Sequence, residues 1–366
     1  MSRLFEPFPL GGLKLKNRFV RSATCENLTS EERLPSEEMI RLYEALAAGG
    51  VGLIITSATR PDRSWDKREF ATWKRLAFDR DEMIPAFQAF TRRVQAAGAR
   101  IALQLGSFYK FYGDFVGPSD AAYMRSASVK DQETIVPRAL TLDEIQEIIG
   151  KYVAAGFRAY QAGFDAVQLG AGHGFPLGQF LSPFFNRRTD AYGGGPENRA
   201  RMLSEIVRGI KAQAGQDFPV LLKINAADFI PGGMTPERAA ETAAVLAENG
   251  ADALETSGGT LGQEMSQFGP SDPRRWAEAY FRDSAAVIKS RVKVPIILVG
   301  GLRSPALMDE ILTLGQADLF SLSRPLIREP GLVNRWRSGD LEPSDCNQCN
   351  GCLDRLMKGE PVECVC

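Results

Sequence analysis

The sequence contains no uninterrupted stretch of about 18 apolar residues, the length that a membrane-spanning helix needs. Its first residues, MSRLFEPFPLGGLKLKNRF, show no cationic leader followed by an apolar segment, so we expect a cytoplasmic protein. It also lacks a charge excess, because 44 basic and 45 acidic side chains give a formal net charge of −1. Such evenly mixed charges disfavour nucleic acid and membrane surfaces as partners.

Histidine is scarce, and so is cysteine over most of the chain. The one histidine, His173, lies in the glycine-rich polar segment 165–201, which follows an apolar run. A parallel α/β fold places its chemistry at such a junction. Of six cysteines only Cys25 precedes residue 346, and the other five crowd the last 21 residues. That crowding suits metal or cluster ligation in a reducing compartment better than a spread disulfide framework.

The sequence does contain a regular alternation of short apolar runs with amphipathic segments, which is typical of repeated βα units around a parallel sheet. The apolar runs predict eight strands, at 18–24, 51–58, 100–106, 165–170, 219–225, 251–258, 295–301 and 317–323. Two intervening segments carry helix-end signals. Segment 141–163 opens with a Thr141-x-x-Glu144 capping box, and segment 235–250 ends on a glycine that can take a left-handed cap.

Eight βα units in one sheet predict an α/β fold, a single closed (β/α)8 TIM barrel. We assign the barrel to residues 1–340 and a short cysteine-rich tail, packed on the barrel or extending from it, to residues 341–366. No linker divides the barrel into two domains. A doubly wound sheet is the alternative, but no G-x-G-x-x-G motif opens the first βα turn.

A barrel exposes its site at the C-terminal ends of its strands, so the residues just past each strand are the candidates. Small residues after the first two strands leave room for a flat ring, and Gln104 and Lys223 offer polar contacts to its edge. Glycine amides after the seventh and eighth strands, together with Arg324, make the phosphate cradle typical of such barrels. The strand ends therefore predict a phosphorylated planar cofactor. The candidates are Ala23, Thr24, Cys25, Ala58, Gln104, Gly170, His173, Lys223, Asn225, Ser257, Gly258, Gly259, Gly300, Gly301, Arg303, Ser323 and Arg324.

The same strand ends carry a resemblance to a known family. NRFVRSAT at 17–24, GGVGLIITSAT at 49–59, GFDAVQLGAGHG at 163–174 and QFLSPFFNRRTDAYGGGPENRAR at 179–201 resemble the old yellow enzymes, the NADH:flavin oxidoreductase family. The match continues in order through GGLRSP to ADLFSLSRPLIREP at 317–330. The resemblance implies a barrel that holds FMN, is reduced by NAD(P)H and passes hydride to an electron-poor C=C bond or a related acceptor.

Carried over position by position, the resemblance assigns roles to the cofactor-binding candidates. It places Lys223 near the N1 and O2 edge of the flavin ring, where a positive charge would stabilise the anionic reduced form. Cys25 stands where some members place a thiol beside the flavin; the alternative is a buried thiol that packs as a small hydrophobic group. The ring-lining residues would be Ala23, Thr24, Ala58 and Gln104, and the phosphate-binding residues Gly300, Gly301, Ser323 and Arg324.

The fourth strand departs from the family pattern. Many members carry H-x-x-H or H-x-x-N followed by G-Y, a pair that grips the substrate carbonyl and a tyrosine that supplies a proton. Here the pair is Gly170 and His173, and Phe175 stands at the tyrosine position. His173 remains as a binder of a carbonyl or carboxylate, or else packs the loop. The proton would come from solvent or from a tyrosine of the long, lid-like segment 106–138, which holds Tyr109, Tyr112 and Tyr123.

The tail reads Cys346-x2-Cys349-x2-Cys352-x11-Cys364-x-Cys366. It resembles the [4Fe–4S] segment of the 2,4-dienoyl-CoA reductase and trimethylamine dehydrogenase branch, with one residue fewer between the second and third cysteines. The first four cysteines are candidate ligands of a [4Fe–4S] cluster or of zinc, and free thiols are the third possibility. That branch feeds its cluster from a second flavin in a C-terminal half that this sequence lacks. We therefore expect a cluster here to need an external donor or to be structural.

Three hypotheses follow. The leading one is an FMN-dependent ene-reductase that consumes NAD(P)H and acts on a small, electron-poor acceptor. The second keeps FMN but makes the chain an electron-transfer protein that a donor protein feeds through the cysteine tail. The third is a different phosphate-binding barrel, such as an aldolase that uses Lys223 as a Schiff-base amine. The sequence leaves a homo-oligomer open.

Overall fold

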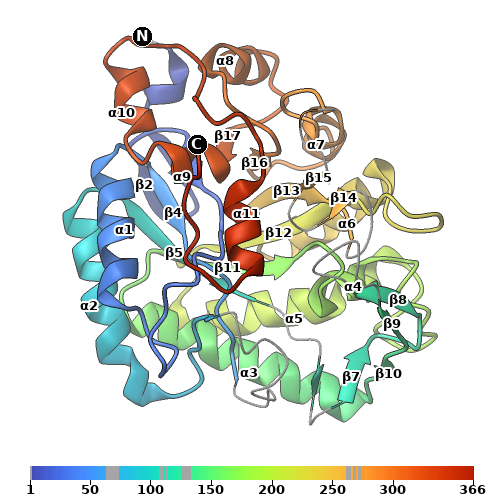
Figure 1. Ribbon diagram of the computed structural model, residues 1–366. Coiled ribbons are helices and arrows are strands. Elements are labelled where there is room, and N and C mark those ends of the chain that lie inside the picture. The colour runs from blue at the N-terminus through green and yellow to red at the C-terminus, as the bar shows by residue number, and fades with distance from the viewer. Residues whose placement is uncertain are drawn as a thin grey trace.

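The computed structural model describes residues 2–62, 74–106, 110–111, 114–125, 133–260, 265–266, 269–270, 274 and 276–366. Its centre is a closed barrel of parallel strands in the order β11–β12–β13–β16–β17–β3–β4–β5 (Figure 1). These strands are β3 (Phe19–Arg21), β4 (Leu53–Ile55), β5 (Arg100–Leu105), β11 (Ala166–Ala171), β12 (Val220–Ala227), β13 (Ala253–Gly258), β16 (Ile296–Val299) and β17 (Leu319–Leu322). Each overlaps one predicted strand, so the predicted TIM barrel is confirmed and the doubly wound alternative is wrong.

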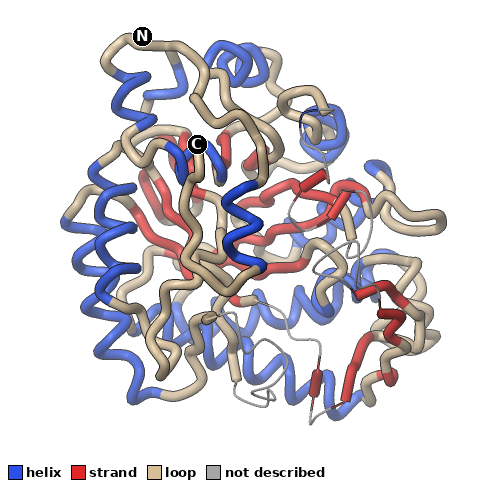
Figure 2. Tube along the Cα trace, in the orientation of Figure 1, coloured by secondary structure: helices blue, strands red, loops and turns tan. Residues whose placement is uncertain are grey.

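Helices surround the barrel strands (Figure 2). The capping box predicted for α3 is present: Thr141 Oγ1 accepts from the Glu144 amide at 3.2 Å, and Glu144 Oε2 accepts from the Thr141 amide at 2.8 Å. After α6, Gly250 has the expected positive φ of 98°. The helices are α1 (Glu37–Ala48), α2 (Ile84–Ala96), α3 (Leu142–Gln161), α4 (Pro176–Leu181), α5 (Pro196–Ala214), α6 (Pro236–Glu248), α7 (Arg282–Lys289), α8 (Pro305–Thr313), α9 (Arg324–Arg328), α10 (Leu332–Arg337) and α11 (Gly351–Met357).

One end of the barrel is closed by apolar packing. The N-terminal hairpin of β1 (Phe8–Leu10) and β2 (Leu13–Leu15) places Leu10 and Leu15 in one buried cluster with strand residues such as Leu53. Full burial of a leucine side chain contributes about 1.5–3 kcal/mol, so this plug stabilises the barrel floor. Polar residues lie at the opposite end of the barrel, where the strands reach their carboxyl termini.

Short elements lie outside the barrel. The segment predicted as a lid, 106–138, includes β6 (Lys110–Phe111), β7 (Asp114–Gly117), β8 (Tyr123–Arg125) and β9 (Glu133–Ile135). The others are β10 (Arg138–Ala139), β14 (Met265–Ser266), β15 (Gly269–Pro270) and the 3-10 turns η1 (Arg3–Phe5) and η2 (Asp81–Met83). Across the described ranges, every helix is too short or too polar to cross a membrane.

The tail lies against the loop that follows β3. Asn27 Nδ2 donates to the Gly359 carbonyl at 2.6 Å, and the Val362 amide donates to the Glu26 carbonyl at 3.0 Å. Figure 1 shows α11 and the chain end passing in front of the barrel strands. The tail is thereby held beside the residues that begin the site, Thr24 and Cys25.

Candidate active site

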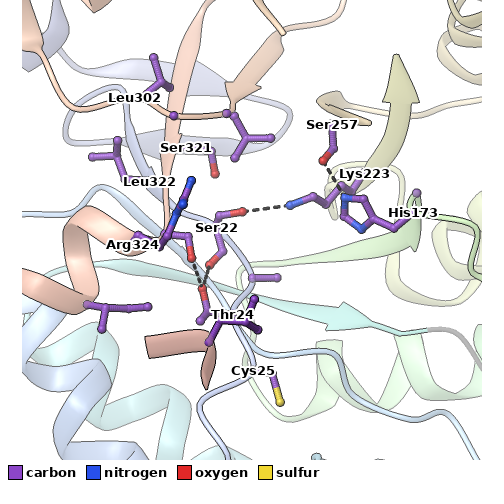
Figure 3. Close-up of a pocket in the computed structure, with 18 of the residues that line it drawn as sticks. Ser22, Thr24, Cys25, His173, Lys223, Ser257, Leu302, Ser321, Leu322 and Arg324 are labelled. Atoms are coloured by element: carbon purple, nitrogen blue, oxygen red, sulfur yellow. Dashed lines mark hydrogen bonds between the residues drawn. The ribbon is translucent and has the colours of Figure 1, made fainter. Parts of the chain in front are cut away.

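A cavity of about 250 Å³ opens at the carboxyl ends of the barrel strands (Figure 3). The ten residues that the resemblance places against FMN, and His173, line it. They are joined by Gly170 and Phe175 of the departing fourth-strand motif and by two tail cysteines. The structure thus brings together Ala23, Thr24, Cys25, Ala58, Gln104, Lys223, Gly300, Gly301, Ser323 and Arg324 with Cys346 and Cys352.

Some candidates lie elsewhere. Tyr109 and Tyr112, the predicted proton donors, fall outside the described residues, and Tyr123 begins strand β8. Asn225 does not line the cavity. Its Oδ1 accepts from the His173 amide at 2.8 Å and its Nδ2 donates to Asp228 at 2.8 Å, so it braces the loop that carries His173.

His173 is held in an unusual backbone conformation with a φ of 63°, and its Nε2 lies 2.7 Å from Ser257 Oγ. Burial, with a smaller effect of the nearby Lys223 charge, lowers the pKa of His173 from 6.5 to about 3. The imidazole is therefore neutral at physiological pH and carries one N–H. It can donate or accept a hydrogen bond, but it is not a strong proton source.

Lys223 Nζ donates to Ser22 Oγ at 3.0 Å and to Glu255 Oε1 at 3.2 Å. In Figure 3, Lys223 and His173 lie on one side of Ser22 and Arg324 lies on the other. The cavity therefore has a polar end formed by β11, β12 and β13, and a second end formed by the residues after β16 and β17. A planar ring with a polar edge, joined to a phosphate, would place polar groups at the same two ends.

Glycines shape the second end. Gly300 and Gly301 have φ values of 122° and 69°, and a Cβ on Gly301 would stand 3.0 Å from the ring of Tyr280. Nearby, the hydroxyl oxygens of Thr24 and Ser323 lie 2.9 Å apart. These backbone amides and hydroxyl groups are suitable donors for a phosphate. Tyr280, which the sequence did not single out, lines the same wall, and burial raises its pKa.

Cys25 and Arg324 mark two borders of the cavity. The half-buried thiol of Cys25 lies away from Lys223 and Arg324 (Figure 3), and burial raises its pKa although Arg75 opposes the shift. Arg75, also missed from the sequence, lines the cavity there. Arg324 Nη1 donates to Asn350 Oδ1 of the tail at 2.8 Å, so the predicted phosphate ligand also contacts the cysteine segment.

The five tail cysteines line a second, smaller cavity, and Cys346 and Cys352 belong to both cavities. Cys349 Sγ and Cys366 Sγ lie 3.4 Å apart. Within the described parts of the chain, no three histidine, cysteine, aspartate or glutamate side chains converge closely enough to hold one metal ion.

Known proteins resemble this chain in sequence and in fold. Residues 3–341 match the sequence model of the NADH:flavin oxidoreductase / NADH oxidase family. An NADH oxidase of Thermoanaerobacter brockii is 33% identical over 369 residues, which cover 99% of this chain and 55% of that protein. An NADPH dehydrogenase of Bacillus subtilis is 31% identical over 335 residues, which cover 90% of this chain and 92% of that protein.

Among solved structures, a 2-naphthoyl-CoA reductase in complex with 2-naphthoyl-CoA superimposes with a TM-score of 0.87 at 24% identity. The superposition covers 99% of this chain and 56% of that one, and at this identity it supports the fold alone. The chain thus spans about half the length of the NADH oxidase and of the reductase. The cysteine tail is part of both of these longer matches.

Proposed function

The chain belongs to the NADH:flavin oxidoreductase / NADH oxidase family, which includes the old yellow enzymes, and from this premise we propose that it holds FMN and uses NAD(P)H to reduce an activated C=C bond. A related electron-poor acceptor could take the place of the alkene. The cavity at the strand ends carries this proposal, because small residues, polar side chains and two consecutive glycines line it together.

The residues present fit FMN. Ala23 and Ala58 are small, and a Cβ on Gly106 would come within 2.7 Å of the Ala58 Cβ, so these three positions hold only small residues beside the cavity. Gly300 and Gly301 present their backbone to the cavity, where larger residues would meet aromatic rings. We propose that these two amides, the Ser323 hydroxyl and the Arg324 guanidinium bind the phosphate.

When bound, FMN supplies hydride transfer between a nicotinamide and an electron-poor acceptor. The chain's own residues bind and orient. The Lys223 ammonium has three donors, and Ser22 and Glu255 take two of them, which leaves one for the ring edge. We propose that the neutral His173 and the Ser257 hydroxyl hold a carbonyl or carboxylate oxygen of the acceptor. Phe175 cannot donate a proton, so the proton comes from solvent or from another residue.

The aldolase alternative is disfavoured by the surroundings of Lys223. A Schiff-base lysine must lose its proton before it attacks a carbonyl. Lys223 Nζ donates to Ser22 and to Glu255, whereas a protonated imine has one N–H and could not make both contacts.

The test is an anaerobic absorption titration of FMN-loaded protein, first with NADH or NADPH and then with 2-cyclohexenone, an electron-poor alkene. Bleaching of the flavin bands by a nicotinamide and their return with the alkene would support the ene-reductase. Protein that binds no FMN, but is inactivated by borohydride in the presence of an aldehyde, would point instead to a Schiff-base enzyme.

A second candidate function rests on the tail. In it, a donor protein supplies electrons to the FMN protein, and the cysteines Cys346, Cys349, Cys352 and Cys364 hold a [4Fe–4S] cluster. Such a cluster supplies one-electron chemistry. The five tail thiols line one cavity, so four of them could surround a cluster. A zinc ion, whose four ligands lie about 2.3 Å from one point, is the alternative occupant. Cys346 and Cys352 line both cavities, which would place a cluster beside the FMN site.

Iron and acid-labile sulfide, measured on anaerobically purified protein, test the cluster. Cys352→Ala should abolish bound iron, whereas Cys366→Ala, the matched control outside the four-cysteine spacing, should retain it. Flavin bands without iron in the wild-type protein would exclude the cluster and support the NAD(P)H-dependent reductase. About four irons per chain, with no bleaching by NADH or NADPH, would favour the partner-fed protein.

A further inference from the structure

Glu255 is a fully buried carboxylate in strand β13, just beneath the cavity. Its Oε1 accepts hydrogen bonds from Ser22 Oγ at 2.8 Å, from Ser321 Oγ at 2.9 Å and from Lys223 Nζ at 3.2 Å. Its Oε2 accepts from Gln168 Nε2 at 2.8 Å. One side chain thus joins β11, β12, β17 and the turn after β3.

The negative charge of Glu255 is stabilised in place. Burial opposes its ionisation, but the Lys223 charge and the hydrogen bonds from Gln168, Ser22 and Ser321 hold its pKa below the ordinary value. Lys223 and Glu255 therefore form a buried pair with no net charge. Their alignment follows from strand register, since Lys223 of β12 stands directly opposite Glu255 of β13.

An ionised carboxylate only accepts hydrogen bonds, and this restriction spreads through its partners. Gln168 must present its amide N–H to Glu255, so its Oε1 faces Gln104, whose Nε2 donates to it at 2.7 Å. Gln104 is thereby oriented with its carbonyl oxygen left for other contacts. The same carboxylate holds Lys223 so that one ammonium donor remains. Both polar residues proposed for the ring edge are therefore oriented by Glu255.

We infer that Glu255 is a positioning residue that orients Lys223 and Gln104 at the ring edge, offsets the Lys223 charge and thereby lowers the reduction potential of the bound FMN. This inference rests on the proposed function. An uncompensated lysine would stabilise the anionic reduced ring more strongly than the oxidised ring and would raise the potential. A glutamate behind the lysine weakens that stabilisation, so the reduced cofactor gives up its electrons more readily.

Anaerobic potentiometric titration of FMN-loaded wild-type protein, Glu255→Gln and Lys223→Met tests the inference. Glu255→Gln should shift the midpoint potential upward, because only the negative charge is lost. Lys223→Met should shift it downward, because the positive charge is lost while the hydrogen bonds from Gln168, Ser22 and Ser321 still stabilise the Glu255 carboxylate. The double variant, which removes both charges, should lie between the single variants and close to the wild type. Glu255→Asp, which keeps the charge, should also stay closer to the wild type than Glu255→Gln.

An unchanged or lower potential in Glu255→Gln would overturn the inference while leaving the flavin enzyme intact. Absence of FMN from the wild-type protein would overturn the proposed function and this inference with it, so the two failures are distinguishable. If an unpaired Lys223 prevents Glu255→Gln from folding, the comparison of the double variant with Lys223→Met decides. These two proteins differ only in the Glu255 carboxylate. The potential of Lys223→Met should be lower than that of the double variant if the inference holds, and equal to it if the inference is wrong.

Discussion

The imidazole Nε2 of His173 lies 2.7 Å from the hydroxyl oxygen of Ser257. His173 follows β11, and Ser257 belongs to β13, two strands away around the barrel. Many old yellow enzymes hold a substrate oxygen with two residues of the fourth-strand motif, and Gly170 stands in place of the first of them here. Both side chains line the cavity. We regard the pair as a replacement grip assembled from two strands.

The replacement grip predicts matched effects of His173→Ala and Ser257→Ala. Each removes one hydrogen-bonding group worth about 1 kcal/mol, so KM for a carbonyl acceptor should rise roughly fivefold. Steady-state kinetics at fixed NAD(P)H would measure this, with the FMN content of each variant as a control. Unchanged KM values with full FMN content would assign His173 to loop packing.

A second prediction concerns the protonation of His173. Its folded-state pKa of about 3 lies below the ordinary 6.5, so the unfolded chain binds the proton more readily. The contribution of neutral His173 to the free energy of unfolding is therefore fully present above about pH 6.5 and is lost as the pH falls toward 3. Because the sequence holds one histidine, ¹⁵N NMR of the imidazole needs no assignment by mutation. The spectrum should show a neutral ring from pH 8 down to pH 5, and a midpoint near 6.5 would contradict this account.

Arg324→Ala should weaken FMN binding. A hydrogen bond to a charged group contributes about 1.5–3 kcal/mol, which corresponds to a rise in Kd of roughly 10- to 150-fold. Arg328→Ala is the matched control, because Arg328 lies on the same short helix α9, is exposed and does not line the cavity. Quenching of FMN fluorescence on binding gives both Kd values. Equal Kd values for the two variants would remove Arg324 from the phosphate site.

The barrel and the gathering of the site were predictable for a simple reason. Eight apolar runs with polar ends define eight strands, and closure of a parallel barrel brings those ends to one rim. A role for Glu255 could not be predicted from the sequence, because this residue lies inside an apolar strand segment. Only the register against β12 reveals that it stands opposite Lys223. Tyr280 and Arg75 reach the cavity from loops, whose paths the strand pattern does not specify. The old yellow enzyme resemblance supplied residue roles, but no role for these three side chains.

The last prediction separates backbone strain from crowding at the phosphate end. Gly301 and Gly315 have nearly equal φ values, 69° and 68°, so alanine at either costs a similar strain of about 1–2 kcal/mol. A Cβ on Gly301 would stand 3.0 Å from the Tyr280 ring, whereas one on Gly315 would meet nothing within 4 Å. Gly315→Ala should therefore lower the unfolding free energy and leave the Kd for FMN unchanged, while Gly301→Ala should also raise that Kd. Thermal unfolding and fluorescence titration of both variants provide the comparison. Equal FMN affinities would show that Tyr280 can move aside and that the closeness of the Gly301 backbone to this ring does not shape the phosphate site.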